Sequence, residues 1–128
     1  PRFRYAHQFQ QADRVIIAAP FWDLSFPALL KVYIENVNVQ GITFDCNEKN
    51  GCFGICRASK MLFFTTRGGA LEGNPMDNGT KYLADMAKFF GIPSFDHIAA
   101  DGLDLGLEPV EDILNRAIAR AVESAKSF

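Results

Sequence analysis

Three short segments rich in apolar residues recur along the chain, and stretches of mixed character separate them. They are Val15–Ala19, Met61–Thr65 and Phe95–Ala100. The first is apolar throughout, as expected of a strand in a parallel sheet that is covered on both faces. Pro20 ends it, because proline has no N–H group to donate to a neighbouring strand. The pattern predicts three strands of a buried, parallel sheet.

Apolar residues at helical spacing predict a helix after each of these strands. The first of these helices is expected to have Ser25 as its cap and Pro27 in its first turn, and to run to about Asn36. The second covers 80–90 and stops at the glycine and proline that follow. The third begins near Pro109. The opening residues, up to Gln10, are typical of the end of a further helix.

The segment 39–60 differs from the rest because short extended pieces in it are broken by Gly51 and Gly54. This pattern predicts an excursion or hairpin before the second strand. The remaining elements alternate between strand and helix, which is typical of an α/β fold with a parallel sheet. The three strands correspond to the last three of a doubly wound, five-stranded sheet of order 2-1-3-4-5, with helices on both faces. Residues 1–128 would then be the C-terminal portion of one domain, without its first two strands.

The composition excludes two classes of partner. The chain has 128 residues, 48% of them hydrophobic, and a net charge of −2 spread along its length, so no basic surface for nucleic acid or an anionic membrane is expected. No apolar run approaches the length of a membrane span and no signal peptide opens the chain, so a cytoplasmic location is expected. The spacing of Cys46, Cys52 and Cys56 favours structural or redox-inert thiols over a metal site.

Ligands of open parallel sheets bind beyond the carboxyl ends of the strands, so the loops that follow the strands are the candidate site. The loop 20–25 contains Phe21 and Trp22, whose flat side chains are suited to cover a planar ring. The loop 65–69 contains two glycines, whose N–H groups can approach a ligand closely. Taken singly, each loop is more typical of an ordinary turn or core edge than of a site. Their expected position at the ends of adjacent strands favours a site for a flat cofactor.

The loop 101–104 is as compatible with a plain turn as with a part of this site. His97 lies inside the third strand, where a satisfied core histidine is expected rather than a catalyst.

Several separated motifs resemble the flavodoxin-like family of FMN-dependent NADH azoreductases and NAD(P)H quinone reductases, some members of which are labelled acyl-carrier-protein phosphodiesterases. The similarity covers nearly the whole chain in the same order. The motifs are Ala18–Lys31, Gly41–Phe44, Thr65–Gly69, Tyr82–Leu83 and Phe89–Ile92.

The resemblance implies an enzyme that takes electrons from NADH or NADPH onto FMN and passes them to a quinone, an azo compound or a similar flat acceptor by a ping-pong mechanism. It implies a homodimer whose subunits share the site. Phe89 and Cys46 would wall the acceptor side of that site across the dimer interface. The residues implied to bind the cofactor are Pro20, Phe21, Trp22, Asp23 and Leu24 along the ring, and Thr66, Arg67, Gly68 and Gly69 at its pyrimidine end through backbone N–H groups.

The chain departs from the family pattern in three places. Asp23 stands where the family often has asparagine, and Cys46 stands where it often has an aromatic residue. The serine-containing loop that holds the FMN phosphate is absent from the sequence, so these residues alone are expected to bind FMN poorly.

Two other classes share this fold. A flavodoxin-type one-electron carrier would bind FMN but would not need the long segment 39–60. A phosphoacceptor signalling domain would need an aspartate where Pro20 stands and a lysine where Asp101 and Gly102 stand. The second class is therefore disfavoured, and the first is kept as the alternative.

Overall fold

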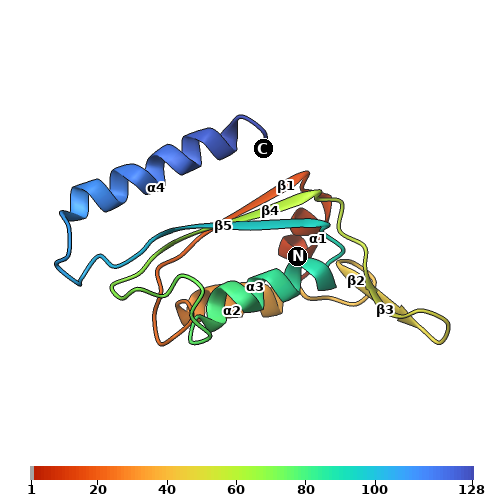
Figure 1. The fold of residues 1–128 in the computed structure, drawn as a ribbon. Helices are drawn as coiled ribbons and strands as arrows, with labels where there is room; N and C mark the ends of the chain where they lie inside the picture. Colours follow the sequence, from red (N-terminus) through yellow and green to blue (C-terminus); the bar gives the residue numbers. More distant parts are fainter. Residues whose placement is uncertain (1) are drawn as a thin grey trace.

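The computed structural model describes residues 2–128 and contains a parallel sheet of three strands (Figure 1). The strands are β1 (Arg14–Ala18), β4 (Lys60–Thr66) and β5 (Ser94–Ala100), in the order β1-β4-β5. Val15 of β1 lies opposite Met61 of β4, which in turn lies opposite Phe95 of β5. The prediction of three parallel strands in sequential order is confirmed.

Helices lie on both faces of the sheet and give it three layers. The expectation that the first strand is covered on both faces was wrong, because the helix on one face packs against β5 and leaves Ile16 of β1 59% exposed. One face carries α1 (Arg4–Gln11), α2 (Ala28–Val37) and α3 (Asn78–Phe89), and α4 (Val110–Ala125) lies alone over the other face (Figure 1). The core lies between the sheet and the first three helices, because their apolar faces meet there. Its members include Phe9, Val15, Val37, Met61, Ala87 and Phe90 in one cluster and Phe26, Ile34, Phe63 and Leu83 in another. No helix among residues 2–128 is long and apolar enough to cross a membrane.

The start of α2 differs from the prediction. Ser25 does not cap the helix, because it closes a tight turn in which its N–H donates to Trp22 O at 2.8 Å. Pro27 is the N-cap residue and no side chain caps the helix. The expected cap was therefore wrong: the chain turns sharply before the helix begins.

The segment 39–60 contains the predicted hairpin, formed by β2 (Phe44–Asn47) and β3 (Gly51–Gly54). Antiparallel pairing places Cys46 opposite Cys52, and the two form a disulfide. The expectation of three thiols was wrong for this pair, because spacing in sequence alone does not reveal that a four-residue strand and a tight return bring the two sulfur atoms together. Cys56 is a free thiol.

The hairpin rests on the C-terminal end of α3 through a close contact between two backbones. A Cβ atom added to Gly54 would lie 1.9 Å from the carbonyl carbon of Phe90, and one added to Gly91 would lie 2.9 Å from Gly54 O. The N–H group of Cys56 also donates to Phe90 O at 3.1 Å. Glycine is therefore required on both sides of this contact.

Candidate functional site

The carboxyl ends of β1 and β4 place the first two strand-end loops side by side. Ala19 N–H donates to Phe64 O at 3.0 Å, and Phe21 N–H donates to Thr66 O at 2.9 Å. The ladder between the two strands thus continues beyond β1 into the first loop. The expectation that these loops share one edge of the sheet is confirmed.

The loop 20–25 presents its largest aromatic side chain to solvent, with Trp22 59% exposed. Asp23 and Leu24 have φ values of 50° and 62°, which non-glycine residues rarely adopt. They are the central pair of the turn that Trp22 and Ser25 close with two hydrogen bonds, Ser25 N–H to Trp22 O at 2.8 Å and Trp22 N–H to Ser25 O at 3.3 Å. Unfavourable backbone conformations that persist in this way concentrate at functional sites.

The glycine-rich loop is held from one side by the loop that follows β5. Arg67 N–H donates to Ala100 O at 2.9 Å, so this N–H group already has a partner at the edge of the sheet. The carbonyl oxygens of Gly68 and Gly69 accept from Asp104 N–H and Gly102 N–H, both at 2.9 Å. Within residues 2–128, the N–H groups of Gly68 and Gly69 themselves have no protein acceptor. Two donors of this loop are thus available to a ligand, and that of Arg67 is not.

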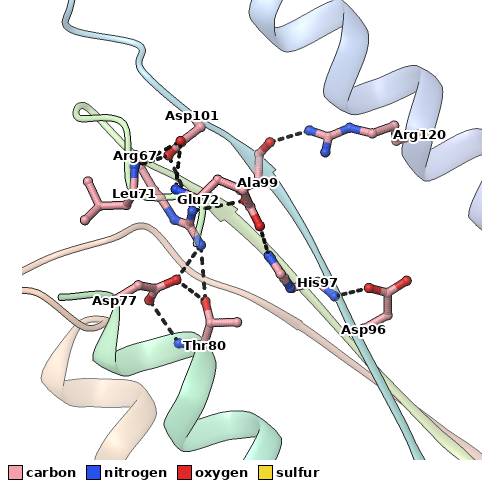
Figure 2. A network of polar contacts seen from close by, with 10 residues as sticks. All are labelled: Arg67, Leu71, Glu72, Asp77, Thr80, Asp96, His97, Ala99, Asp101 and Arg120. Atoms are coloured by element: carbon pink, nitrogen blue, oxygen red, sulfur yellow. Dashed lines mark hydrogen bonds and ion pairs between the residues drawn. The ribbon is translucent and has the colours of Figure 1, made fainter. Parts of the chain in front are cut away.

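The side chain of Arg67 is turned away from solvent and is only 1% exposed (Figure 2). Its Nη2 lies 2.5 Å from Asp77 Oδ2 and 3.2 Å from Thr80 Oγ1. Its Nη1 lies 3.2 Å from Glu72 Oε2 and 3.4 Å from Asp101 Oδ1. The guanidinium group of Arg67 therefore faces the protein.

The partners of Arg67 were not singled out from the sequence. Asp77 caps α3, since its Oδ1 accepts from Thr80 N–H at 3.1 Å. Asp101 accepts from the N–H groups of Leu71 and Glu72, each at 3.0 Å. The spacing Asp77-x-x-Thr80 before an apolar helical face is a recognisable cap signal, whereas nothing in the sequence connects Asp101 with Arg67.

Two cavities lie on either side of residues 18–20. The first, of about 420 Å³, lies between the sheet and α4, where its wall includes Pro20, Thr66 and Ile118. The second, of about 580 Å³, lies between the β1 end and α2, where its wall includes Leu29 and Tyr33. Of the described residues that line either cavity, none is charged. Both cavities are suited to flat apolar surfaces rather than to anions.

Phe89 is the last residue of α3, and Cys46 belongs to β2 of the hairpin that contacts this end of the helix, whereas the loop 20–25 contacts its first turn. The ring of Phe89 packs on Phe44, with centroids 4.8 Å apart. Within one chain the structure does not bring these two residues to the strand-end loops. His97 Nε2 lies 2.7 Å from Glu72 Oε1, so its ring has the partner that was expected, although it is only partly buried.

The family assignment follows from comparison with known proteins. The model of the family described as having a flavodoxin-like fold matches residues 3–125. The chain belongs to this flavodoxin-like family. The predicted fold class is confirmed.

Curated relatives in the flavodoxin-like family match almost all of the chain. One from Clostridium acetobutylicum, named FMN-dependent NADH:quinone oxidoreductase 2, is 44% identical over 128 residues, which cover 98% of this chain and 64% of the relative. Another, from Caldicellulosiruptor saccharolyticus and named FMN-dependent NADH:quinone oxidoreductase, is 38% identical over 131 residues, with coverage of 100% and 65%. The chain thus spans about two thirds of the length of these relatives.

Solved structures of flavodoxin-like proteins are also similar to the chain. An azoreductase from Bacillus anthracis superimposes with a TM-score of 0.87 at 30% identity, covering 98% of this chain and 61% of that one. An FMN-dependent NADH-azoreductase from the same species, solved in complex with FMN, has a TM-score of 0.84 at 24% identity, with coverage of 96% and 59%. The similarity to this second structure shows the fold alone. The names of these proteins confirm the resemblance identified from the sequence motifs.

Proposed function

We propose that the chain is the C-terminal portion of one domain of an FMN-dependent oxidoreductase, which takes electrons from NADH or NADPH and delivers them to a quinone, an azo compound or a similar flat acceptor. The observation that carries this proposal is that, within residues 2–128, the N–H groups of Gly68 and Gly69 have no protein acceptor and belong to the loop adjacent to the one that carries the exposed Trp22. The names of the relatives agree with it.

The residues present fit the ring of FMN. The uncharged cavity of about 420 Å³ at the end of β1 and β4 offers apolar contact, and the loop that continues from Thr66 in its wall carries the two glycine N–H donors. FMN, when bound, would supply the acceptance of one hydride, which carries two electrons, and the later release of these two electrons to an acceptor. The protein would supply orientation, exclusion of water and electrostatic tuning, so no acid, base or nucleophile is assigned.

The proposed roles divide between the two loops. Pro20, Phe21, Trp22, Asp23 and Leu24 would lie along the ring, and Thr66, Gly68 and Gly69 would lie at its pyrimidine end. Donors aimed at that end stabilise the negative charge that the ring gains on reduction. Arg67 would contribute through its contacts inside the protein, because its own N–H donates to Ala100 O.

We further propose a cytoplasmic homodimer in which Phe89 and Cys46 of one subunit face the flavin of the other. Support comes from α2, where Leu29 is 80% exposed and Val32 is 49% exposed, since apolar side chains so exposed on one helix suit a contact with another subunit.

The test is to express the coding sequence with any codons that lie upstream in frame. The purified protein should be yellow, its flavin absorbance should bleach with NADH or NADPH under argon, and a quinone should restore the colour. A protein that takes up no flavin, or whose flavin is not reduced by either nucleotide, would refute the proposed function. A flavin that binds but is reduced by neither nucleotide, and that dithionite takes through a stable one-electron form, would instead favour a flavodoxin-type carrier.

A further inference from the structure

We propose that Arg67 is a positioning residue that holds the two strand-end loops at a fixed separation by anchoring the N-terminal end of α3. The inference rests on the proposed function, because the two loops matter as the two sides of a flavin site. Arg67 would then support the site from inside the protein. The sequence motif had instead placed it among the residues that touch the cofactor.

The first step is that the Arg67 guanidinium group joins segments that are distant in sequence. Its partners belong to the 70–77 loop, to the start of α3 and to the end of β5, as Figure 2 shows. Asp77 is itself only 10% exposed in its side chain, and the two groups approach to 2.5 Å. A charge this deeply buried holds its partners strongly, because loss of one partner leaves the other charged and without solvent.

The second step leads from Asp77 to the loop 20–25. Asp77 Oδ2 also accepts from Thr80 Oγ1 at 2.6 Å, which fixes the first turn of α3. From that turn, Asn78 N–H donates to Leu24 O at 3.0 Å. Gly79 lies so close that an added Cβ would be 3.2 Å from Ser25 Cα. The start of α3 is thus seated directly on the Trp22–Ser25 turn.

The third step leads from Arg67 to the glycine loop. Arg67 precedes Gly68 in the chain, and its Nη1 contact reaches Asp101, which binds the N–H groups of the 71–72 backbone. The next residue, Gly102, donates from its N–H to Gly69 O at 2.9 Å. The Arg67 guanidinium group therefore fixes the position of the Trp22–Ser25 turn. It also fixes the loop whose Gly68 and Gly69 N–H groups have no acceptor within residues 2–128.

The composition of this cluster favours a positioning role over simple stabilisation. Arg67 Nε is buried and has no hydrogen-bond partner among the described residues. An unpaired buried N–H is unfavourable, and a core built for stability alone would use an apolar residue here. Arginine has two Nη atoms on a rigid plane, one bound to Asp77 and the other to Asp101, whereas lysine has a single nitrogen on a flexible stem.

The experiment compares Arg67→Lys and Asp77→Asn with the unmodified protein, expressed with any upstream residues. Asp77→Asn is the sharper variant, because an asparagine Oδ1 still accepts from Thr80 N–H and preserves the cap. We expect both variants to bind FMN about tenfold more weakly or worse. We also expect a lower two-electron midpoint potential of the bound flavin, because misplaced glycine donors stabilise the reduced ring less well.

The matched control is Asp85→Asn. It removes the same charge from the same helix, but Asp85 is exposed and pairs only with Lys81, at 2.6 Å. Flavin affinity and potential should be unchanged. Wild-type affinity and potential in both Arg67→Lys and Asp77→Asn would overturn the proposal, as would an equal loss in the control.

A second measurement separates this proposal from the proposed function. Amide hydrogen exchange without flavin should be at least about tenfold faster at Asn78 and Gly102 in both variants, while Ala19, bonded within the sheet, stays protected. Unchanged exchange at Asn78 and Gly102, or equal loss at Ala19, would overturn the positioning role. If the unmodified protein binds no flavin, the proposed function fails, and this exchange pattern alone decides whether Arg67 fixes the two loops.

Discussion

At the scale of single residues, the charge of Asp23 has the most direct consequence for the proposed chemistry. Its φ of 50° suits aspartate and asparagine better than most other residues, so the turn itself does not select between the two. The side chain is exposed beside Trp22 at the edge where the flavin is proposed to bind. A carboxylate there would oppose the negative charge of a reduced ring.

Asp23→Asn should therefore raise the two-electron midpoint potential of bound FMN. Removing one partly solvated charge is worth about 1 kcal/mol, which corresponds to roughly 20 mV. Potentiometric titration of the flavin-loaded protein measures this directly. Glu111→Gln, at the exposed start of α4, serves as the control for a change in net charge. A potential that falls or stays constant in Asp23→Asn would contradict the assignment of Asp23 to the ring edge.

Cys56 offers a prediction that does not depend on flavin. Burial raises the pKa of this thiol from 9.0 to about 11, because the thiolate form loses solvation. At pH 8 the reactive thiolate should then be about a hundredfold scarcer than for an ordinary cysteine. Iodoacetamide labelling followed by mass spectrometry should show slow modification of Cys56 whose rate rises about tenfold per pH unit until pH approaches 11.

The disulfide supplies the control for this measurement. Cys46 and Cys52 should not react before reduction. After reduction, Cys52 is exposed and should be alkylated faster than Cys56 at the same pH. Rapid labelling of Cys56 at pH 8 would show that it is not shielded as described.

At the scale of elements, the hairpin β2–β3 depends on glycine at its contact with α3. Gly54→Ala would place a methyl group 1.9 Å from the backbone carbon of Phe90, where no side-chain rotation relieves the overlap. The free energy of unfolding should fall by about 3 kcal/mol or more, as for other overpacked sites. Chemical denaturation followed by circular dichroism tests this.

Gly51→Ala is the matched control, because Gly51 is in the same strand and an added Cβ would meet nothing within 4 Å. Its φ of 64° should limit the loss to about 1 kcal/mol. Equal losses in both variants would mean that the hairpin is not docked through Gly54.

The elements also show what the sequence could predict. The strands β1 and β4 were predicted from their runs of consecutive apolar residues, although β1 is buried on one face only. The helices α3 and α4 were predicted because their apolar faces repeat regularly. The pairing of Cys46 with Cys52 could not be predicted, because it depends on hairpin register. The burial of Arg67 was also beyond sequence reasoning, since its partners come from three segments that only the folded chain brings together. The two candidate loops were correctly placed because parallel strands end at the same edge.

At the scale of the whole molecule, the exposed face of α2 is the proposed contact between subunits. Leu29→Arg should weaken the dimer, because it places a charge where apolar surfaces would meet. Sedimentation velocity at micromolar concentration should show a shift toward monomer. Leu107→Arg is the control, since Leu107 is 84% exposed in the loop before α4 and lies on another surface. If the unmodified protein sediments as a monomer, the proposed dimer is refuted, and with it the roles proposed for Phe89 and Cys46.

The distribution of charge around the site determines how the 128 residues should bind flavin when they are expressed alone. The cavities beside residues 18–20 have uncharged walls, and the adjoining loops carry the acidic side chains of Asp23 and Asp104. A doubly charged phosphate needs several fixed donors or cations, and within residues 2–128 the backbone donors of the loops 20–25 and 65–69 that lack a protein acceptor are split between Asp23 and Leu24 on one loop and Gly68 and Gly69 on the other.

We therefore expect the 128-residue chain to bind FMN and riboflavin with dissociation constants within about threefold of each other, because the phosphate would remain in solvent and contribute little. Flavin fluorescence titration measures both constants, and the FMN constant should change little between low and moderate salt. The comparison protein, with any upstream residues included, should prefer FMN strongly. FMN binding to the 128 residues more than about tenfold tighter than riboflavin binding, and weakened by salt, would reveal a phosphate site among residues 2–128 that the described contacts do not contain.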